Sequence, residues 1–509
     1  MLKYKNIVFI ALAGIALSSS SCRKFLNVNT NPNVAQTATV QTLLPAAQLY
    51  VGTAVGVDLE IDGSFWAQYW TQSISASQYH VLDLYTNISQ DQFSYPWSNL
   101  YSAAENFFQM YKLADSQKKK QYMAVSLLMQ AYTFELITDG WGDIPFKQAL
   151  KGQFADSNMV SPKYDSQMVV YNGIIAYIDS ANALISFADS LHPGSDDLIY
   201  GGSMKEWQKF SNTLMLKVLL RMGYITPAAS QASIAALYAT SPTFIGNGDD
   251  AKIAYGFNSA NQNPLFSEET GLLGTQNLVG SATCIDSMNT NHDPRIAVFY
   301  APAKATGTFV GLQQGLYSGN FSINDVSIPG VYVAGNAQSS ASGTAPVNLL
   351  TSWESYFLQA EVAARGWAAA GTDGGLFLNG INASISYYGS DITAATDSTE
   401  AVAANDYLNG VPGAGGYSAG YWVQYPTTGT TTQKLRYIIT QKWFAMCGNQ
   451  GFEAWCEWRR TGYPDFLVQS ATGVGAKPRR FYYPTSESTT NASYPGTVPL
   501  TTPVWWDVN

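Results

Sequence analysis

Apolar residues recur at three- and four-residue steps along several long stretches, the spacing that places them on one face of an α-helix. One such stretch begins at Thr39, and another runs from Ser98 to Tyr111. Lys118–Lys120 mark a turn, after which the pattern resumes. Two amphipathic helices joined by a short turn are typical of a tetratricopeptide unit. Further helices are predicted at residues 123–135, 166–191, 203–222, 228–239, 353–370 and 432–446.

Long segments rich in Gly, Ser, Asn and Thr separate these helices. They are residues 71–96, 241–291, 301–346 and 371–431. Since they carry aromatic and apolar residues throughout, we expect ordered excursions from a helical scaffold. The sequence therefore predicts a mainly α protein of tetratricopeptide-like helix pairs with long irregular loops. No shift in composition divides the chain, so residues 39–509 are predicted to form a single domain.

The first 21 residues have the features of an export signal. Lys3 and Lys5 precede a short apolar run, and small residues follow at positions 18–21. The run is shorter than the roughly 20 residues that a membrane-spanning helix needs. Cys22 comes next, which predicts a lipoprotein acylated at Cys22 and tethered through residues 22–38. The alternative is an ordinary secretory signal with an incidental cysteine.

The other three cysteines are Cys284, Cys447 and Cys456. An odd number of thiols does not form a complete disulfide framework. Two interpretations stay open: Cys447 and Cys456 pair across a glycine-rich turn, or all three are buried free thiols.

Low charge narrows the classes of function. The chain is 46% hydrophobic, 13% aromatic and only 12% charged, with a net charge of −9. Intrinsic disorder requires lower hydrophobicity and more charge. An acidic chain also lacks the basic field that nucleic acid binding needs, so no nucleic acid partner is expected. The surface must instead be covered by uncharged polar residues.

Catalytic and metal-binding patterns are sparse. The three histidines are far apart in the chain, so no metal site and no cofactor are predicted. No nucleophile elbow or phosphate-binding loop is present. Carboxylate pairs such as Asp249–Asp250 are the kind of group a glycosidase uses, but solvated or capping carboxylates are the simpler interpretation.

A charged cluster near the C-terminus has two interpretations as well. Glu453, Glu457, Arg459 and Arg460 lie among tryptophans. Because neighbouring arginines keep carboxylates ionised, a packing network is favoured over acid–base chemistry.

Aromatic residues in uncharged polar segments suggest sugar binding, because a sugar stacks a flat C–H face on an aromatic ring and its hydroxyls pair with amides and carboxylates. Core packing is the alternative for each, and Trp66 and Trp70, four residues apart, suit one buried helical stripe. The candidate ligand-binding residues are Trp66, Trp70, Tyr79, Tyr85, Gln262, Asn263 and Tyr317.

Several short motifs, in this order over nearly the whole chain, resemble the SusD/RagB family of outer-membrane lipoproteins of Bacteroidota. They are Phe25–Asn33 after Cys22, Thr138–Phe146, Asn291–Arg295, Phe357–Glu361, Gln441–Pro464 and Arg479–Glu487.

This resemblance implies four tetratricopeptide-like helix pairs that support a looped binding face. It also implies a non-catalytic lipoprotein on the outer membrane, exposed at the cell surface, that captures an oligosaccharide or polysaccharide. The implied partner is a SusC-like TonB-dependent transporter, over which the protein sits as a lid. Two alternatives remain: a surface glycosidase on the same scaffold, or a lid protein that captures peptides or other nutrients.

Overall fold

The structure is a computed structural model that describes residues 38–509 except 153–156, 273, 317–318, 320, 397 and 412–417. The predicted export signal, Cys22 and Tyr317 lie outside the described residues.

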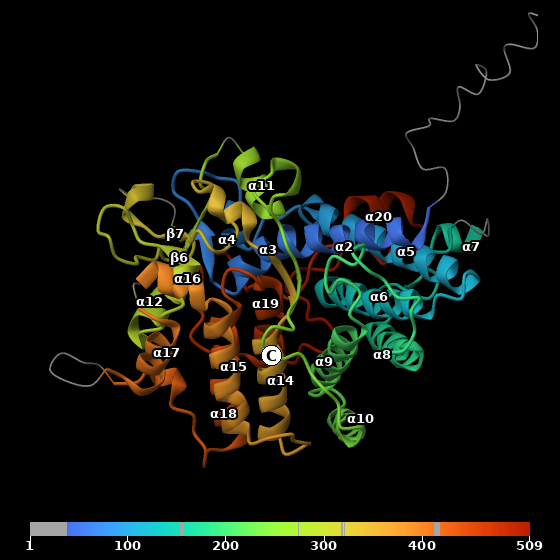
Figure 1. The fold of residues 1–509 in the computed structure, drawn as a ribbon. Coiled ribbons are helices and arrows are strands. Elements are labelled where there is room, and N and C mark those ends of the chain that lie inside the picture. Colours follow the sequence, from blue (N-terminus) through green and yellow to red (C-terminus); the bar gives the residue numbers. More distant parts are fainter. Residues whose placement is uncertain are drawn as a thin grey trace, which may run out of the picture.

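One half of the molecule is an array of long helices, seen on the right of Figure 1. Neighbours along the chain pack against one another, α5 on α6 and α8 on α9, and α2 packs against α5. Thr39 and Thr42 exchange side-chain and backbone hydrogen bonds in a capping box that starts the first helix. The array comprises α2 (Val40–Gly56), α5 (Ser94–Ser116), α6 (Lys120–Trp141), α8 (Gln167–Leu184), α9 (Met204–Met222) and α10 (Pro227–Ala239).

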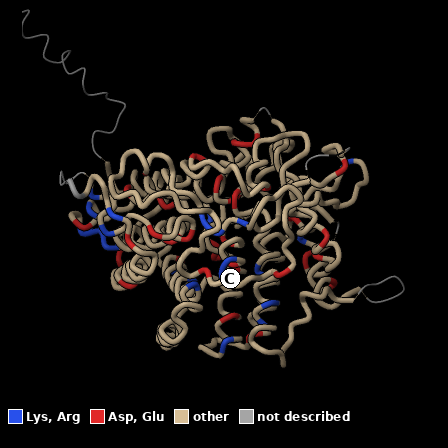
Figure 2. Tube along the Cα trace, turned by 180° about the vertical axis from the view of Figure 1, so that it is seen from behind, with Lys and Arg blue, Asp and Glu red and all other residues tan. Residues whose placement is uncertain are grey.

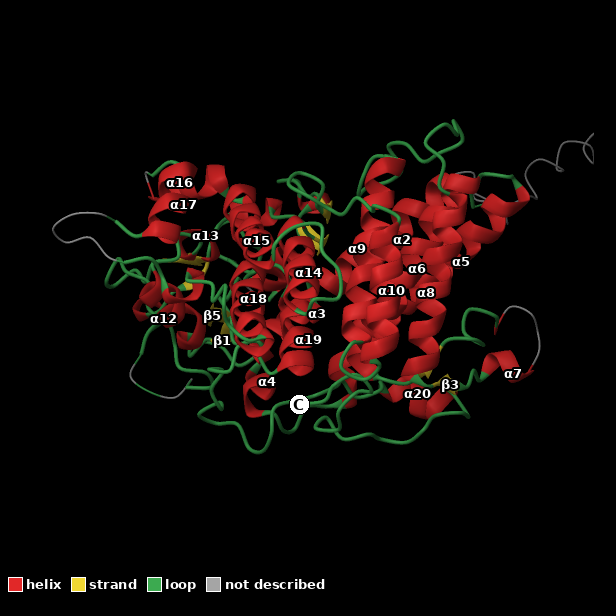
Figure 3. Cartoon of the chain, turned by 90° about the horizontal axis from the view of Figure 1, so that it is seen from below, coloured by secondary structure: helices red, strands yellow, loops and turns green. Residues whose placement is uncertain are grey.

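A second helical layer lies beside this array, in the centre of Figure 3. Within it α14 packs against α15 and α18, while α19 packs against α3. Gly63 of α3 meets the start of α19 so closely that a Cβ there would overlap the backbone nitrogen of Phe452. The layer comprises α3 (Asp58–Trp66), α14 (Ser352–Ala364), α15 (Asp373–Tyr387), α18 (Thr431–Met446) and α19 (Gly451–Thr461).

The remaining segments form a looped region with short elements, including α11 at the top of Figure 1 and α12, α16 and α17 on its left. Its helices are α4 (His80–Leu84), α11 (Pro264–Gly271), α12 (Ala282–Asn291), α13 (Ile296–Phe299), α16 (Gly389–Thr396) and α17 (Glu400–Asn409). Two more short helices, α7 (Ser157–Val160) and α20 (Thr485–Thr490), lie at the edge of the helical array.

All strands in the described part of the chain form two-stranded antiparallel sheets. In the first, Trp70 pairs with Gly280. The pairs are β1 (Trp70–Gln72) with β5 (Leu278–Gly280), β2 (Ile144–Pro145) with β3 (Tyr164–Asp165), β4 (Ala251–Ile253) with β8 (Val347–Leu350), and β6 (Tyr300–Ala301) with β7 (Ile328–Pro329).

One large hydrophobic core extends from Val40 to Trp506 and joins the helical array to the second layer. Charged residues are sparse on a mostly tan trace, as Figure 2 shows. The mainly helical, tetratricopeptide-like fold predicted from the sequence is confirmed.

The long helices occur where the periodicity predicts them, but residues 371–431 were expected to be irregular and instead contain α15, α16 and α17. The Thr372 hydroxyl accepts the backbone N–H of Gly375 to start α15. Leu376, Phe377 and Ile381 then form its buried face. The glycines and short polar residues of this helix obscured its apolar period in the sequence.

Cys284, Cys447 and Cys456 are free thiols buried in the core. The Sγ atoms of Cys284 and Cys447 lie 3.9 Å apart. The interpretation that these residues are buried free thiols is therefore correct.

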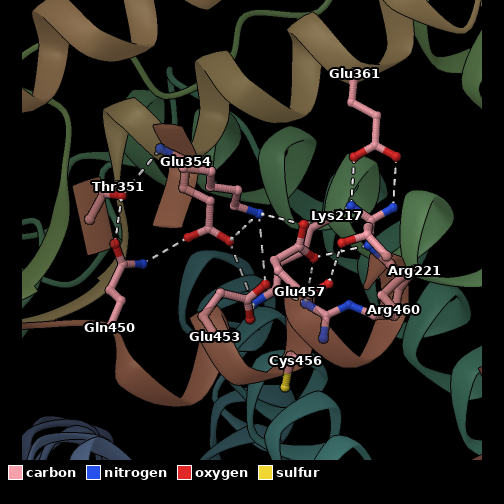
Figure 4. Close-up of polar contacts among 12 residues, drawn as sticks. Lys217, Arg221, Thr351, Glu354, Glu361, Gln450, Glu453, Cys456, Glu457 and Arg460 are labelled. Carbon is pink, nitrogen blue, oxygen red and sulfur yellow. Dashed lines mark hydrogen bonds and ion pairs between the residues drawn. The ribbon is translucent and has the colours of Figure 1, made fainter. Parts of the chain in front are cut away.

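Three of the four charged residues of α19 belong to a buried ion network, shown in Figure 4, whereas Arg459 donates to the backbone carbonyls of Asp139 and Arg479. Arg460 donates to both carboxylate oxygens of Glu361 on α14, at 2.7 and 2.6 Å, and to Glu457. Glu453 binds Lys217 at 2.9 Å and also pairs with Arg221, both from α9. The predicted packing network is thus confirmed, and it joins three helices that are far apart in the chain.

Candidate ligand-binding site

Trp66 and Trp70, the two tryptophans predicted to stack on a ligand, are both fully buried. The ring centroids of Trp66 and Trp455 lie 4.7 Å apart, and Trp66 Nε1 donates to the carbonyl of Leu82 at 3.2 Å. Trp70 lies in β1 rather than on a continuation of the same helix. Neither ring presents a face to solvent. Both rings pack in the core, which is the alternative interpretation that the sequence left open.

The predicted tyrosines of the same segment are nearly as enclosed. Tyr79 is 6% exposed, and its hydroxyl donates to Glu269 at 2.8 Å. Tyr85 is 5% exposed and adopts a left-handed conformation at the C-terminal end of α4. Ligand contact by these four rings stays a prediction, and their burial argues against it.

The two predicted amide residues have different environments. Asn263 is buried and caps α11, since its Oδ1 accepts the backbone N–H of Leu265 at 2.9 Å. Pro264 follows at the first helical position, which needs no N–H donor. Gln262 is half-buried and lines a cavity. Tyr317 lies outside the described residues, so its role stays a prediction.

This cavity has a volume of about 630 Å³, within the roughly 300–1,000 Å³ range of small-molecule pockets. We call it the α11 groove. One wall comes from α2 and the beginning of α3, a second from the beginning of α5, and a third from the segment that leads into α11. Its lining residues are Leu49, Thr53, Val57, Asp58, Tyr95, Asn99, Tyr255, Ser259, Ala260, Gln262, Pro264, Ser267 and Glu268.

Two tyrosines and two amide side chains give the α11 groove its chemistry. The Tyr95 ring is 74% exposed, whereas Tyr255 is half-buried, and this burial raises the pKa of its hydroxyl to about 12. Asn99 is half-buried, and its side-chain amide makes no hydrogen bond within the described part of the chain. The Gln262 Nε2 donates to the carbonyl of Phe257 at 3.3 Å, which leaves its oxygen as an acceptor. The groove therefore offers ring faces together with uncharged donors and acceptors.

The charged residues that line the α11 groove are both acidic. Burial, and secondarily the charge of Glu268, raises the pKa of Asp58 to about 7. Glu268 is exposed, and among the described residues no Lys or Arg belongs to the lining. The described lining consequently carries a negative potential and offers no cationic side chain to an anionic ligand.

Tyr95 and Tyr255 were not among the residues singled out from the sequence. In the sequence, Tyr95 directly precedes Pro96 at the end of a segment that is predicted to be irregular. The structure makes that proline part of the first turn of α5, so Tyr95 starts a helix and points out of the core. A tyrosine before a helix-initiating proline was the available signal.

Among the described residues, no group of three or more His, Cys, Asp or Glu side chains is arranged to hold a metal ion. Within the same part of the chain, no helix combines the length and the apolarity that spanning a bilayer requires.

Comparison with known proteins identifies a family. A family model named SusD-like, described as "Starch-binding associating with outer membrane", matches residues 32–484. A comparison with curated proteins finds no match.

Solved structures show the same fold. The chain is similar to a chitin-binding SusD homologue from Flavobacterium johnsoniae, with 25% identity, a TM-score of 0.73, and coverage of 92% of this chain and 99% of that one. SusD homologues from Bacteroides uniformis and Bacteroides fragilis superpose with TM-scores of 0.72 and 0.73 at 23% and 22% identity. Each alignment covers 92% of this chain and 99% of the other. Because the family model covers most of its length, the chain belongs to the SusD-like family of starch-binding proteins that associate with the outer membrane.

Proposed function

We propose that this protein binds an uncharged oligosaccharide in the α11 groove, through ring stacking and hydrogen bonds and without covalent chemistry. The observation that carries the proposal is the exposed Tyr95 ring together with the Asn99 amide, which makes no hydrogen bond among the described residues, on the wall of a cavity of about 630 Å³. A tyrosine presents an apolar face and a polar edge together, which matches the mixed surface of a sugar.

The comparisons support the chemical class of the ligand. The family is described as starch-binding, and the homologue from Flavobacterium johnsoniae is described as chitin-binding. Starch and chitin are both polymers of sugars without net charge. A groove whose charged lining residues are both carboxylates suits such a ligand better than an anionic one.

We also propose that the protein is a surface lipoprotein acylated at Cys22, with residues 39–509 acting as one domain. In this proposal it delivers its ligand to a SusC-like TonB-dependent transporter. The family's association with the outer membrane supports the location, and the single core from Val40 to Trp506 supports the single domain.

Isothermal titration calorimetry with chito-oligosaccharides and malto-oligosaccharides tests the binding proposal. We expect one series to bind, and Tyr95→Ala to weaken binding by roughly 5- to 30-fold, the loss of about 1–2 kcal/mol typical of an aromatic anchor. Because Tyr95 is 74% exposed, this variant should fold normally. Phe187→Ala, at an exposed aromatic residue outside the groove, is the matched control and should bind as the wild type does.

Three results would contradict the proposal. Failure of every glycan to bind, with peptides binding instead, would favour a lid for other nutrients. Release of shortened products, abolished by Asp58→Asn, would favour a glycosidase. Unchanged affinity in Tyr95→Ala would exclude the α11 groove as the site.

A further inference from the structure

A second hollow lies next to the α11 groove along the seam where α2 packs against α5, and both helices contribute lining residues to each hollow. It has a volume of about 500 Å³ and reaches Ser486 and Glu487 of α20, so we call it the α20 groove. Tyr50, Trp97 and Tyr101 line it together with polar residues. Like the α11 groove, it is lined by aromatic residues, uncharged polar residues and two acidic residues.

We infer that the ligand-binding surface continues along this seam from one groove to the other, so that one extended, uncharged glycan chain occupies the α11 groove and the α20 groove together. This inference rests on the proposed function and adds a second binding segment and a minimum ligand length to it.

Neighbouring residues along both helices open into different grooves. On α2, Leu49 lines the α11 groove and Tyr50 lines the α20 groove. On α5, Asn99 lines the α11 groove and Ser98 lines the α20 groove. Consecutive residues of an α-helix point about 100° apart, since each turn holds 3.6 residues. Adjacent residues of both helices at the α2–α5 seam therefore line the two grooves.

The seam itself is exposed and free of charge. Leu49 and Tyr50 are 43% and 41% exposed, an unusual pair of large side chains on a helix surface. None of the 17 residues of α2 is charged, and the first charged residue of α5 is Glu105. An uncharged chain that crosses here displaces no strongly hydrated ionic group from water, so the crossing carries little desolvation cost.

The α20 groove is held rigid from below. The Trp97 ring packs against Trp141 at 5.2 Å and against Tyr101 at 4.7 Å. The Tyr101 hydroxyl donates to the carbonyl of Pro145 at 2.8 Å, and the Asn106 amide donates to the carbonyl of Ser102 at 2.8 Å. The Tyr50 hydroxyl, in contrast, makes no hydrogen bond within the described residues. A fixed floor with one available ring at its rim is preorganised for stacking.

The acidic residues of the α20 groove are already engaged. Glu105 accepts the Gln109 amide at 2.6 Å, and Glu487 accepts the Tyr164 hydroxyl at 2.6 Å. These carboxylates are therefore held in place as acceptors for sugar hydroxyls. As in the α11 groove, no Lys or Arg of the described part of the chain lines the cavity.

The two grooves together exceed the volume that a drug-sized ligand fills, although each alone lies within that range. A chain that has bound one groove presents its next sugars to the other at high effective concentration. Affinity should therefore rise steeply once the chain is long enough to cross the seam.

The test measures affinity by calorimetry for chito-oligosaccharides and malto-oligosaccharides of increasing length, from two to eight sugars. We expect at least a tenfold gain between the short and the long members of the series that binds. Tyr50→Ala should weaken binding of the longest oligosaccharide by roughly 5- to 30-fold and change that of the shortest by less than twofold. Tyr50→Phe keeps the ring and should bind both as the wild type does.

Tyr95→Ala should weaken binding of short and long oligosaccharides alike, which separates the two grooves. Affinity that is independent of length, or a Tyr50→Ala variant that binds the longest ligand normally, would overturn the inference and leave the proposed function intact. Absence of binding at every length in both series would contradict the proposed function and this inference together.

Discussion

Tyr79, placed by its sequence context among candidate sugar-stacking residues, donates its hydroxyl proton to the buried carboxyl of Glu269 over 2.8 Å. The same carboxyl accepts the backbone N–H of Asn277 at 3.2 Å. This pairing ties the segment before α4 to α11, one wall of the α11 groove. Tyr79 therefore helps to position α11, and its direct contact with a ligand stays a prediction.

Tyr79→Phe should therefore destabilise the fold without changing the affinity of the α11 groove for its ligand. Loss of the hydroxyl leaves a buried carboxyl oxygen without its donor, which costs about 1–3 kcal/mol in the free energy of unfolding. Urea denaturation measures that loss, and calorimetry with the longest binding oligosaccharide should show less than a twofold change. A large loss of affinity at wild-type stability would restore Tyr79 to the binding site.

Glu60 makes stability depend on pH. It lies at the contact of α3 with α19, where its Oε2 accepts the backbone N–H of Gly451 at 2.7 Å. Burial raises its pKa to about 8, against an ordinary value of 4.5. The folded state therefore retains a proton that the unfolded state loses above pH 4.5. The contribution of Glu60 to stability is complete below pH 4.5 and is lost as the pH rises through 8.

Glu60→Gln mimics the protonated side chain and should remove this contribution to the pH dependence. We expect its free energy of unfolding to increase relative to that of the wild type as the pH is raised from 5 to 9. Urea denaturation at pH 5, 7 and 9 measures the trend. Asp115→Asn, at an exposed carboxylate without an ion pair among the described residues, is the control and should track the wild type. A constant difference between Glu60→Gln and the wild type across this range would refute the assignment.

Arg460 is expected to be essential to the buried ion network. It is fully buried and bridges Glu361 on α14 and Glu457 on α19. Arg460→Met removes one cationic partner from each of these two buried carboxylates. Breaking a buried ion pair in this way typically costs about 3–5 kcal/mol in the free energy of unfolding.

Arg436→Met is the matched control, because the Arg436–Asp465 pair is 37% and 42% exposed and should contribute about 0–1 kcal/mol. Denaturation of the two variants under one set of conditions compares them. Equal losses would show that burial does not distinguish the two ion pairs.

The carboxylates of the α11 groove should discriminate against anionic glycans. An oligosaccharide containing uronic acid is expected to bind at least fivefold more weakly than its uncharged counterpart of equal length, because Asp58 and Glu268 repel it. Glu268→Gln should narrow this difference and leave the uncharged ligand within twofold. Added salt should narrow it as well, since exposed charges are screened. Calorimetry at two salt concentrations measures both effects, and tighter binding of the anionic ligand would contradict the groove's assigned electrostatics.

The scaffold was predictable from the sequence because its helices carry clear apolar periods. Residues 203–222 and 432–446 were expected to be helical, and α9 and α18 occupy nearly those bounds. In α15, glycines and short polar residues conceal a period that only tertiary packing reveals. Local pattern therefore identifies a helix only where its own composition is strongly amphipathic.

The site was less predictable, because an aromatic residue in a polar segment has the same sequence signature whether it faces a ligand or the core. Trp66 looked like a stacking platform and is fully buried, whereas Tyr95 looked like the end of a loop and is largely exposed. What separates them is the packing partner supplied from far along the chain, which is Trp455 for Trp66, whereas Tyr95 contacts no aromatic ring within the described residues. Those partners are known only once the fold is known.

The hydrogen bond between Glu60 and Gly451 joins residues 391 positions apart. During synthesis, α3 emerges long before the segment that must cover it, and its apolar face remains without its native partner until the chain is almost complete. Contacts of such high sequence separation slow folding, since the chain must lose the entropy of closing a long loop before these contacts can form and stabilise the fold. A truncated chain that ends before α19 should therefore remain prone to aggregation, and folding of the full chain should be a late event that follows release of the C-terminal helices.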